Sequence, residues 1–278
     1  MKYIAALVVL LSQPAWAFDV TLIGRLEQGG IITGTAPVGA SITYNGHTVP
    51  TNERGAFVFG IDRDAPPAAV LKVTYAKGAV ETRELQISKR DWKIDRVDGV
   101  PQKLVTPDPE TAAKIIAENK IMAEARNTLE LTPFYETGFM RPVEGGRISG
   151  VFGSQRILNG TPGSPHSGLD FAGPIGTPIR AAADGVVTLQ RPDMIMTGNT
   201  VVLNHGYGLE TVYIHMSKIL VTQGQRVKQG DVIGEIGMTG RANGPHLHFG
   251  VTWFNTRLDP ETVLATLPPR AENARDSK

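Results

Sequence analysis

The sequence predicts a mostly β protein in which two β-rich parts are joined by a helix. Residues 18–100 contain short runs of β-favouring residues separated by turn residues, and residues 101–140 contain a segment rich in helix formers. Residues 141–265 return to short strands among abundant glycines, with no helix pattern between them. Because parallel strands need long crossovers, both β-rich parts are expected to form antiparallel sheets.

The first β-rich part has the strand spacing of a small antiparallel β-sandwich. Its runs include "GIITGTA", "GAFVFGI" and "VLKVTYA". Asn45 and Gly46 form a strong hairpin signal, because a type I′ turn needs positive φ at both central positions. His47 follows this turn and is expected to lie at the surface.

The segment between the β-rich parts carries the signals of a helix from about residue 109 to residue 131. Asp108 can cap this helix, Pro109 suits its first turn and Pro133 stops it. Its apolar residues form a narrow stripe that consists of Ile115, Ile116, Met122 and Leu129. A narrow stripe predicts packing against one neighbour, and we interpret the helix as a linker between two domains.

The first seventeen residues, "MKYIAALVVLLSQPAWA", have the features of a secretory signal peptide cut after Ala17. Their apolar stretch is shorter than the ~20 residues that a membrane-spanning helix needs. The chain is therefore expected to be exported without a membrane span, with a charged flexible tail over residues 266–278.

The composition excludes several classes of protein. The chain has no cysteine, so it contains neither disulfides nor cysteine-ligated zinc. Lys2 is the only charged residue before the expected cut, and the rest of the chain carries equal numbers of basic and acidic residues. This balance argues against a nucleic-acid partner.

Three distant segments each present histidine or aspartate in a strand-like context. In "GPHLHFGV", His246 and His248 occupy alternate positions, which share one face of a strand. In "HSGLD", the nearby glycines and prolines favour an extended or looped segment that can aim His166 and Asp170 at one point. The third segment, "TVYIH", ends at His215.

Strand alternation gives an expectation for the surroundings of His215. It places Tyr213 and His215 on one face, while Val212 and Ile214 fill the core. Taken singly, each polar residue could mark a solvated strand face or a surface hydrogen bond. Taken together, imidazole and carboxylate suit Zn²⁺, which keeps three protein ligands in catalytic sites and leaves a fourth position for water.

Together these segments resemble the M23 family of metallopeptidases, the lysostaphin and LytM group that cuts peptidoglycan. The similarity covers about residues 141–260. It includes, in the family's order, "ISGVFG", "HSGLDFAGPIGTPIRAAADGVV", "GNTVVLNHGYGLETVYIH" and "VKQGDVIGEIGMTGRANGPHLHFGV". The resemblance implies a C-terminal antiparallel β-sheet peptidase domain over residues 141–265. Its expected activity is zinc-dependent hydrolysis of peptide bonds in peptidoglycan stem or cross-link peptides. The leader without a lipidation cysteine and the absence of cysteine from the rest of the chain favour the bacterial periplasm, with a Gram-positive exterior as the alternative.

The resemblance also implies roles for the five side chains. His166, Asp170 and His248 are expected to bind Zn²⁺. His215 and His246 are expected to handle the protons of the attacking water, since an imidazole can exchange a proton near neutral pH. No His-Glu-x-x-His motif supplies a glutamate base. The sequence leaves open which histidine is the general base.

Two further residues and one alternative fold interpretation have weaker support from the sequence. Arg156 lies shortly before the first expected metal ligand and could hold a substrate carboxylate or be an ordinary solvated arginine. His205, in "NHGYG", is expected to be structural. The run "VKQGDVIGEIG" also resembles a lipoyl carrier domain, but Lys228 lies inside the turn-and-strand pattern instead of at a hairpin tip.

Two questions of function stay open at the level of sequence. A catalytically silent protein with the peptidase fold could bind the cell wall or activate an amidase, although such proteins typically lack metal ligands. The N-terminal β part could bind the cell wall, act as a spacer, or control access to the catalytic groove. Its connection through a helix leads us to expect the last of these.

Overall fold

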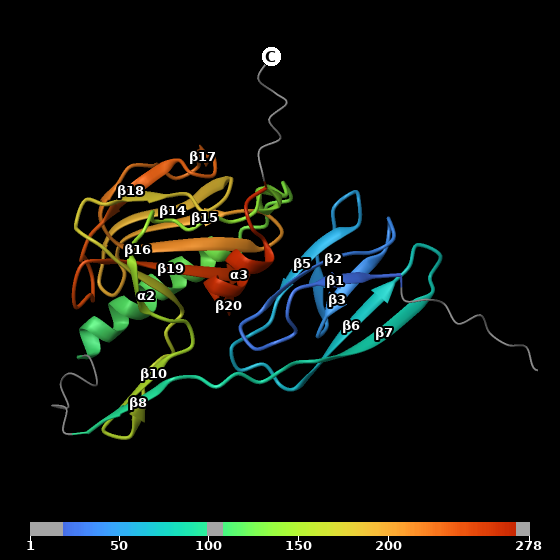
Figure 1. The fold of residues 1–278 in the computed structure, drawn as a ribbon, viewed down its shortest axis with the longest axis horizontal. Helices are drawn as coiled ribbons and strands as arrows, with labels where there is room; N and C mark the ends of the chain where they lie inside the picture. Colours follow the sequence, from blue (N-terminus) through green and yellow to red (C-terminus); the bar gives the residue numbers. More distant parts are fainter. Residues whose placement is uncertain (1–18, 99–107, 271–278) are drawn as a thin grey trace, which may run out of the picture.

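The computed structural model describes residues 19–98 and 108–270. The expected signal peptide, residues 1–17, and the outer part of the expected tail lie outside the described residues. Within these residues, no helix combines the length and the apolar character that a membrane span requires. The architecture is mostly β with antiparallel sheets, which confirms the predicted fold class (Figure 1).

The N-terminal sandwich consists of two small antiparallel sheets. One sheet contains β1 (Thr21–Ile23), β2 (Ile31–Thr35) and β5 (Ala56–Gly60). The other contains β3 (Ser41–Tyr44), β4 (His47–Val49), β6 (Ala68–Thr74) and β7 (Val80–Gln86). The sheets meet where Tyr44 stacks on Phe59, with ring centroids 4.4 Å apart. The predicted β3–β4 turn is confirmed, because Asn45 and Gly46 both have positive φ.

The C-terminal part is built on one ten-stranded antiparallel sheet. Its main path follows the order β17-β14-β15-β16-β19-β12-β9, with β13, β18 and β20 paired beside it. The strands are β9 (Arg147–Gly150), β12 (Gly168–Ala172), β13 (Pro178–Arg180), β14 (Gly185–Met194), β15 (Gly198–Asn204), β16 (Leu209–Ile219), β17 (Arg226–Val227), β18 (Val232–Ile236), β19 (His246–Trp253) and β20 (Thr256–Leu258).

One face of this sheet shares a continuous apolar core with the N-terminal sandwich. Tyr44 meets Trp253 edge-on, with ring centroids 6.5 Å apart. Gly60 lies so close to β20 that an added Cβ would come within 2.6 Å of the Leu258 side chain. A core that runs through both parts joins them directly, so the helix is not the only connection between them.

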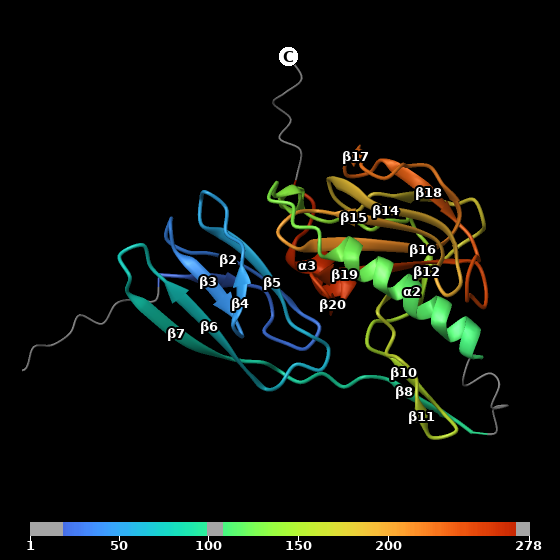
Figure 2. The same cartoon turned by 180° about the vertical axis from the view of Figure 1, so that it is seen from behind.

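The other face of the sheet is covered in part by α2 (Pro109–Arg126), which lies across it in Figure 2. The helix begins where expected, because the Asp108 carboxylate accepts a hydrogen bond from the Thr111 backbone N–H at 3.0 Å. Met122 is buried and belongs to an apolar cluster that also contains Leu189, Met194, Val202, Val212 and Ile214. The helix therefore packs against β14 and β15, and Met122 shares this cluster with two residues of β16.

The helix ends at Arg126, earlier than the sequence predicts. Beyond it, the Asn204 side chain donates to the Thr128 carbonyl at 2.6 Å, and the Tyr207 N–H donates to the Glu130 carbonyl at 2.8 Å. These bonds hold residues 128–130 against the sheet. These carbonyls accept hydrogen bonds from Asn204 and Tyr207 instead of from the next turn of a helix, so tertiary contacts decide where the helix stops.

The chain between the two parts also forms a strand that the sequence analysis missed. β8 (Ile94–Val97) pairs in parallel with β10 (Gln155–Leu158), which forms a hairpin with β11 (Thr161–Pro162). This strand extends from the N-terminal sandwich to the hairpin, as Figure 1 shows. The sandwich therefore reaches a segment that directly precedes His166.

Residues 266–270 at the end of the described chain were expected to begin a flexible tail, but hydrogen bonds attach them to the rest of the fold. After α3 (Pro260–Thr266), the Leu267 carbonyl accepts from the Phe139 N–H at 2.7 Å. The Arg270 N–H donates to the carbonyl of Thr137, the last residue of the 3₁₀ helix η1 (Phe134–Thr137), at 3.0 Å. Residues 266–270 are thus bound to the fold, because their backbone groups find partners in a neighbouring segment.

Glu210 lies on β16 close to Arg126, the last residue of α2, and its side chain is fully buried. Burial raises the pKa of Glu210 to about 9, and the positive charge of Arg126 opposes this only in part. Near pH 7 the folded protein therefore keeps Glu210 protonated, whereas in the unfolded chain it ionises above its ordinary pKa of 4.5.

Replacing Glu210 with Gln should make the free energy of unfolding depend less on pH between pH 5 and pH 8. In the unmodified chain the unfolded state binds fewer protons than the folded state in this window, so stability falls as pH rises, by at most about 1.4 kcal/mol per pH unit. Gln cannot ionise and removes this contribution. Urea unfolding of both proteins at pH 5, 6.5 and 8 measures the slope, and equal slopes would show that folded Glu210 is ionised.

Candidate active site

His166, Asp170 and His248 converge on one point over one face of the ten-stranded sheet. Asp170 on β12 lies directly opposite His248 on β19, so both side chains share one face of the sheet. His166 reaches the same point from the loop before β12. His248 Nδ1 lies 2.9 Å from Asp170 Oδ1 and 3.0 Å from His166 Nε2, and His166 Nε2 lies 3.1 Å from Asp170 Oδ1.

These three atoms could hold a metal ion. Zinc binds nitrogen and oxygen ligands at about 2.0–2.2 Å. Ligand atoms around one such ion therefore lie within about 3.5 Å of one another, and the observed spacing fits. The remaining ring nitrogens also suit this role, because metal-binding histidines usually donate their second N–H to a fixed acceptor. His166 Nδ1 lies 3.0 Å from the Val151 carbonyl, and His248 Nε2 lies 3.4 Å from Ser167 Oγ.

The charge of Asp170 is also suited to a cation. Burial alone would raise the pKa of Asp170, but hydrogen bonds from His166 and His248 outweigh that effect and hold the pKa below its usual range. Burial lowers the pKa of His248, although its hydrogen bond with Asp170 opposes the shift. The ionised Asp170 and the neutral His248 are in the protonation state that metal binding requires. For His166, burial would lower the pKa, but the hydrogen bond with Asp170 and its negative charge, together with backbone hydrogen bonds, outweigh burial and raise it, so a metal ion would have to displace a proton from this ring.

His215 and His246 lie beside this cluster. Their ring centroids are 4.8 Å apart, and the His215 ring lies 6.4 Å from that of His248. His246 Nε2 is 3.9 Å from Asp170 Oδ1. The structure therefore brings together all five of the histidine and aspartate residues selected from the sequence.

His215 reaches the site through a break in strand alternation, and the expectation that it shares a face with Tyr213 is wrong. Tyr213 lies opposite Phe249 and points into the main core, whereas Val212 and Ile214 face the cluster under α2. At His215 the backbone has a φ of 65° and the pairing of β16 shifts register. This left-handed residue interrupts the two-residue period and turns the imidazole toward His246.

Two backbone carbonyls fix the position of His215. Its N–H donates to the Thr197 carbonyl at 2.9 Å, and its ring Nδ1 donates to the Thr239 carbonyl at 2.8 Å. With Nδ1 protonated, Nε2 of a neutral ring is free to accept a proton. Burial lowers the pKa of His215 to about 4 in spite of the hydrogen bond to Thr239, so the ring is neutral at pH 7.

Thr239 is a residue of the site that the sequence analysis missed. Its hydroxyl donates to the Met216 carbonyl at 2.8 Å and accepts from the Asn199 N–H at 2.9 Å, so it links the loop before β19 to the irregular part of β16. Gly198 permits this approach, since a Cβ there would lie 2.2 Å from Thr239 Oγ1. The available signal was the position of Thr239 within the long motif that ends in "GPHLHFGV".

The other two selected residues lie apart from the cluster. His205 is fully buried, with Nδ1 2.6 Å from the Asp184 carbonyl and Nε2 2.7 Å from Thr211 Oγ1, and burial lowers its pKa to about 4. This environment fits the structural role expected for it. Arg156 is exposed on β10, and within residues 108–270 no described contact joins its side chain to the cluster. Its role in substrate binding stays a prediction.

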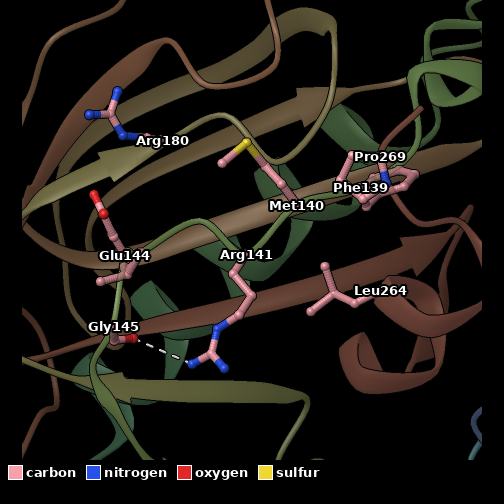
Figure 3. Close-up of a pocket in the computed structure, with 9 residues that line it drawn as sticks. Phe139, Met140, Arg141, Glu144, Gly145, Arg180, Leu264 and Pro269 are labelled. Atoms are coloured by element: carbon pink, nitrogen blue, oxygen red, sulfur yellow. Dashed lines mark hydrogen bonds between the residues drawn. The ribbon is translucent and has the colours of Figure 1, made fainter. Parts of the chain in front are cut away.

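A separate pocket of about 590 Å³ is lined by residues that include Phe139, Arg141 and Leu264 (Figure 3). Arg141, which lines it, stacks over the ring of Phe171 at 5.0 Å. Phe171 points away from the face that carries its neighbour Asp170, into the main core. The pocket contains none of the five clustered residues, so it is not part of the candidate active site.

Comparisons with known proteins agree with this geometry. The model of peptidase family M23 matches residues 164–260, which include all five clustered residues. The chain is 49% identical over 104 residues to the peptidoglycan DD-endopeptidase ShyA of Vibrio cholerae, a match that covers 37% of this chain and 24% of ShyA. It is 43% identical over 103 residues to the DD-carboxypeptidase/endopeptidase Mpg of Neisseria meningitidis, again covering 37% and 24% of the two chains.

The matched segment thus spans about a quarter of the length of these curated relatives. A solved structure gives a more extensive match. The crystal structure of a Pseudomonas aeruginosa protein assigned to peptidase M23 superimposes with a TM-score of 0.69 at 30% identity, covering 88% of this chain and 97% of the other. With the family motifs in order and almost the whole of that relative covered, this chain belongs to peptidase family M23.

Proposed function

We propose that this chain is an exported zinc endopeptidase that hydrolyses peptide bonds in peptidoglycan stem or cross-link peptides. The convergence of His166, Asp170 and His248 within about 3 Å of one another, with two further imidazoles beside them, carries this proposal. The relatives named as peptidoglycan DD-endopeptidase and DD-carboxypeptidase/endopeptidase support the choice of substrate. The leader-like residues 1–17 support export, and a peptidoglycan substrate supports a periplasmic location.

In this proposal His166, Asp170 and His248 hold Zn²⁺ through Nε2, Oδ1 and Nδ1, the three atoms that face one another. When bound, Zn²⁺ supplies a Lewis acid that polarises the scissile carbonyl and lowers the pKa of a coordinated water. The protein's contribution is to present these three ligands together on one side, which leaves room for water and substrate.

His215 and His246 then manage the protons of the reaction. A neutral imidazole accepts a proton from the attacking water and returns one to the leaving amine. The hydrogen bond to the Thr239 carbonyl directs the unprotonated Nε2 of His215 away from that loop. His246 Nδ1 is held in a similar way, 2.8 Å from the Gly244 carbonyl. Either histidine can serve as the base, with the other stabilising developing charge.

The position of α2 limits where a substrate peptide can lie. The helix packs on β14 and β15 and contributes Met122 to the apolar cluster around Val212 and Ile214, on the same face as His248. We infer that the peptide lies over β12 and β19, the strands that carry Asp170 and His248, because α2 packs on β14 and β15. Arg156 stays a candidate for binding a substrate carboxylate.

Replacing single histidines should separate metal binding from proton transfer. His248→Ala should lose both zinc and activity, because it removes a ligand. His215→Ala should retain zinc and lose about 100- to 10,000-fold in kcat, the usual contribution of general acid–base catalysis. Zinc content by mass spectrometry and turnover of a cross-linked muropeptide are the two measurements.

The exposed His47 of β4 provides the matched control, and His47→Ala should change neither quantity. Loss of zinc from His215→Ala would overturn the proposed division between metal ligands and proton-transfer residues.

Digestion of muropeptides with defined cross-links should identify the bond that is cut. We expect the zinc-loaded protein to release products whose masses correspond to cleavage of a peptide bond, and chelation of the metal should abolish the reaction. Mass spectrometry of the products distinguishes stem cleavage from cross-link cleavage. A protein that leaves all muropeptides intact but stimulates a cell-wall amidase without metal would instead be a catalytically silent member of the fold.

A further inference from the structure

The loop formed by residues 151–154 holds His166 through three hydrogen bonds. The His166 N–H donates to the Ser154 carbonyl at 2.7 Å, and the His166 carbonyl accepts from the Gly153 N–H at 2.9 Å. On the ring, Nδ1 donates to the Val151 carbonyl at 3.0 Å, which leaves Nε2 directed at Asp170. Every polar group of His166 except its ligand nitrogen is therefore bound to this loop.

The N-terminal sandwich is hydrogen-bonded to the same loop through Arg63. The guanidinium donates from Nε and Nη2 to the Gly153 carbonyl, at 3.0 and 2.7 Å. The Arg63 side chain is only 12% exposed, and it is also paired with Asp64 at 2.6 Å. Hydrogen bonds from a charged donor are stronger than neutral ones, and a nearly buried arginine that converges on one carbonyl fixes that peptide in place.

Trp92, in the segment between β7 and β8, packs directly on the loop. A Cβ added at Gly153 would lie 2.2 Å from the Trp92 ring, so the backbone itself is in contact with the indole. The neighbouring Phe152 is buried and meets Trp92 edge-on, with ring centroids 5.7 Å apart. Arg63 also lies over this indole, 5.1 Å from the ring centroid.

The far end of the loop is held by strand pairing. The Gln155 N–H donates to the Lys93 carbonyl at 2.9 Å, where β10 begins to pair with β8. Residues 152, 153 and 155 are thus each bound to the N-terminal part of the chain. His166 is connected to that part through residues 151, 153 and 154.

The three expected metal ligands differ in what holds them. Asp170 and His248 are fixed by the direct pairing of β12 with β19 inside the sheet. His166 precedes β12 and has no strand partner of its own. Its orientation therefore depends on a loop, and that loop is shaped by Arg63, Trp92 and Lys93.

We propose that Arg63 and Trp92 are positioning residues for the metal ligand His166, so that the N-terminal sandwich sets the metal affinity of the peptidase part. This rests on the proposed function, in which His166 binds zinc. Groups that orient a metal ligand typically affect metal affinity by 10- to 100-fold when they are removed. In this proposal the sandwich is more than a cell-wall binding module or a spacer, because it fixes the orientation of the His166 ring through contacts from outside the sheet.

Zinc affinity of the full chain, measured by competition with a chromophoric chelator, tests the proposal without any activity assay. Arg63→Met keeps much of the side chain's apolar contact but removes both hydrogen bonds to Gly153, and it should weaken zinc binding about tenfold or more. Arg63→Lys can restore one donor, so its zinc affinity should lie between that of the unmodified chain and that of Arg63→Met. Trp92→Leu should weaken zinc binding in the same direction.

Arg54→Met is the matched control, because Arg54 also connects the sandwich to the C-terminal part, through Glu136 of η1 at 2.7 Å. It should leave zinc affinity unchanged. Thermal melting of the metal-free proteins separates a positioning role from general destabilisation. If Arg63 had only a structural role, zinc affinity would fall in proportion to the melting temperature in Arg63→Met and in Arg54→Met alike.

The proposal is overturned if Arg63→Met and Arg63→Lys bind zinc as tightly as the unmodified chain, or if Arg54→Met loses as much affinity as Arg63→Met. Should Arg63→Met fail to fold, the milder Arg63→Lys decides alone. If these variants bind normally while the unmodified chain cleaves muropeptides, the proposed function stands and only this inference fails. An unmodified chain that binds no zinc would overturn both.

Discussion

The register between β12 and β19 is the constraint on which the candidate active site depends. It places Asp170 opposite His248, and it places their neighbours Phe171 and Leu247 opposite each other in the core. A slip by one residue would move a charged side chain into the core and an aromatic ring into the site. The burial of the apolar residues therefore fixes the geometry of the polar ones, because the same strands supply both.

The proton-transfer side of the site is built in a different way, from local departures from regular structure. His215 has a left-handed backbone, a conformation that costs a residue with a side chain about 1 kcal/mol or more. Hydrogen bonds to the Thr197 and Thr239 carbonyls hold it there. The result is an imidazole that leaves the core face of β16 and turns toward His246, a position that regular alternation would not give it.

Two parts of the chain outside the central sheet, α2 and the N-terminal sandwich, lie on different sides of this site. α2 covers the strands beside the histidines, and the N-terminal sandwich holds the loop that carries His166. The shared apolar core around Tyr44 and Trp253 joins the sandwich to the sheet, so these contacts form within one connected structure. The sequence had led us to expect that the sandwich controls access to the catalytic groove, and that expectation stays a prediction.

The sequence alone determined what depends on local chemistry. The β-rich composition, the Asn45-Gly46 turn, the Asp108-Pro109 start of α2 and the five candidate residues could all be predicted, since each follows from residue type and spacing. Only the tertiary structure decided the rest. Hydrogen bonds between residues distant in sequence decide three features, and most of these bonds go to backbone carbonyls. The features are the direction of the His215 side chain, the end of α2 at Arg126 and the contact of Arg63 with Gly153. Every residue carries such a carbonyl, so the sequence gives no sign of which ones will be used.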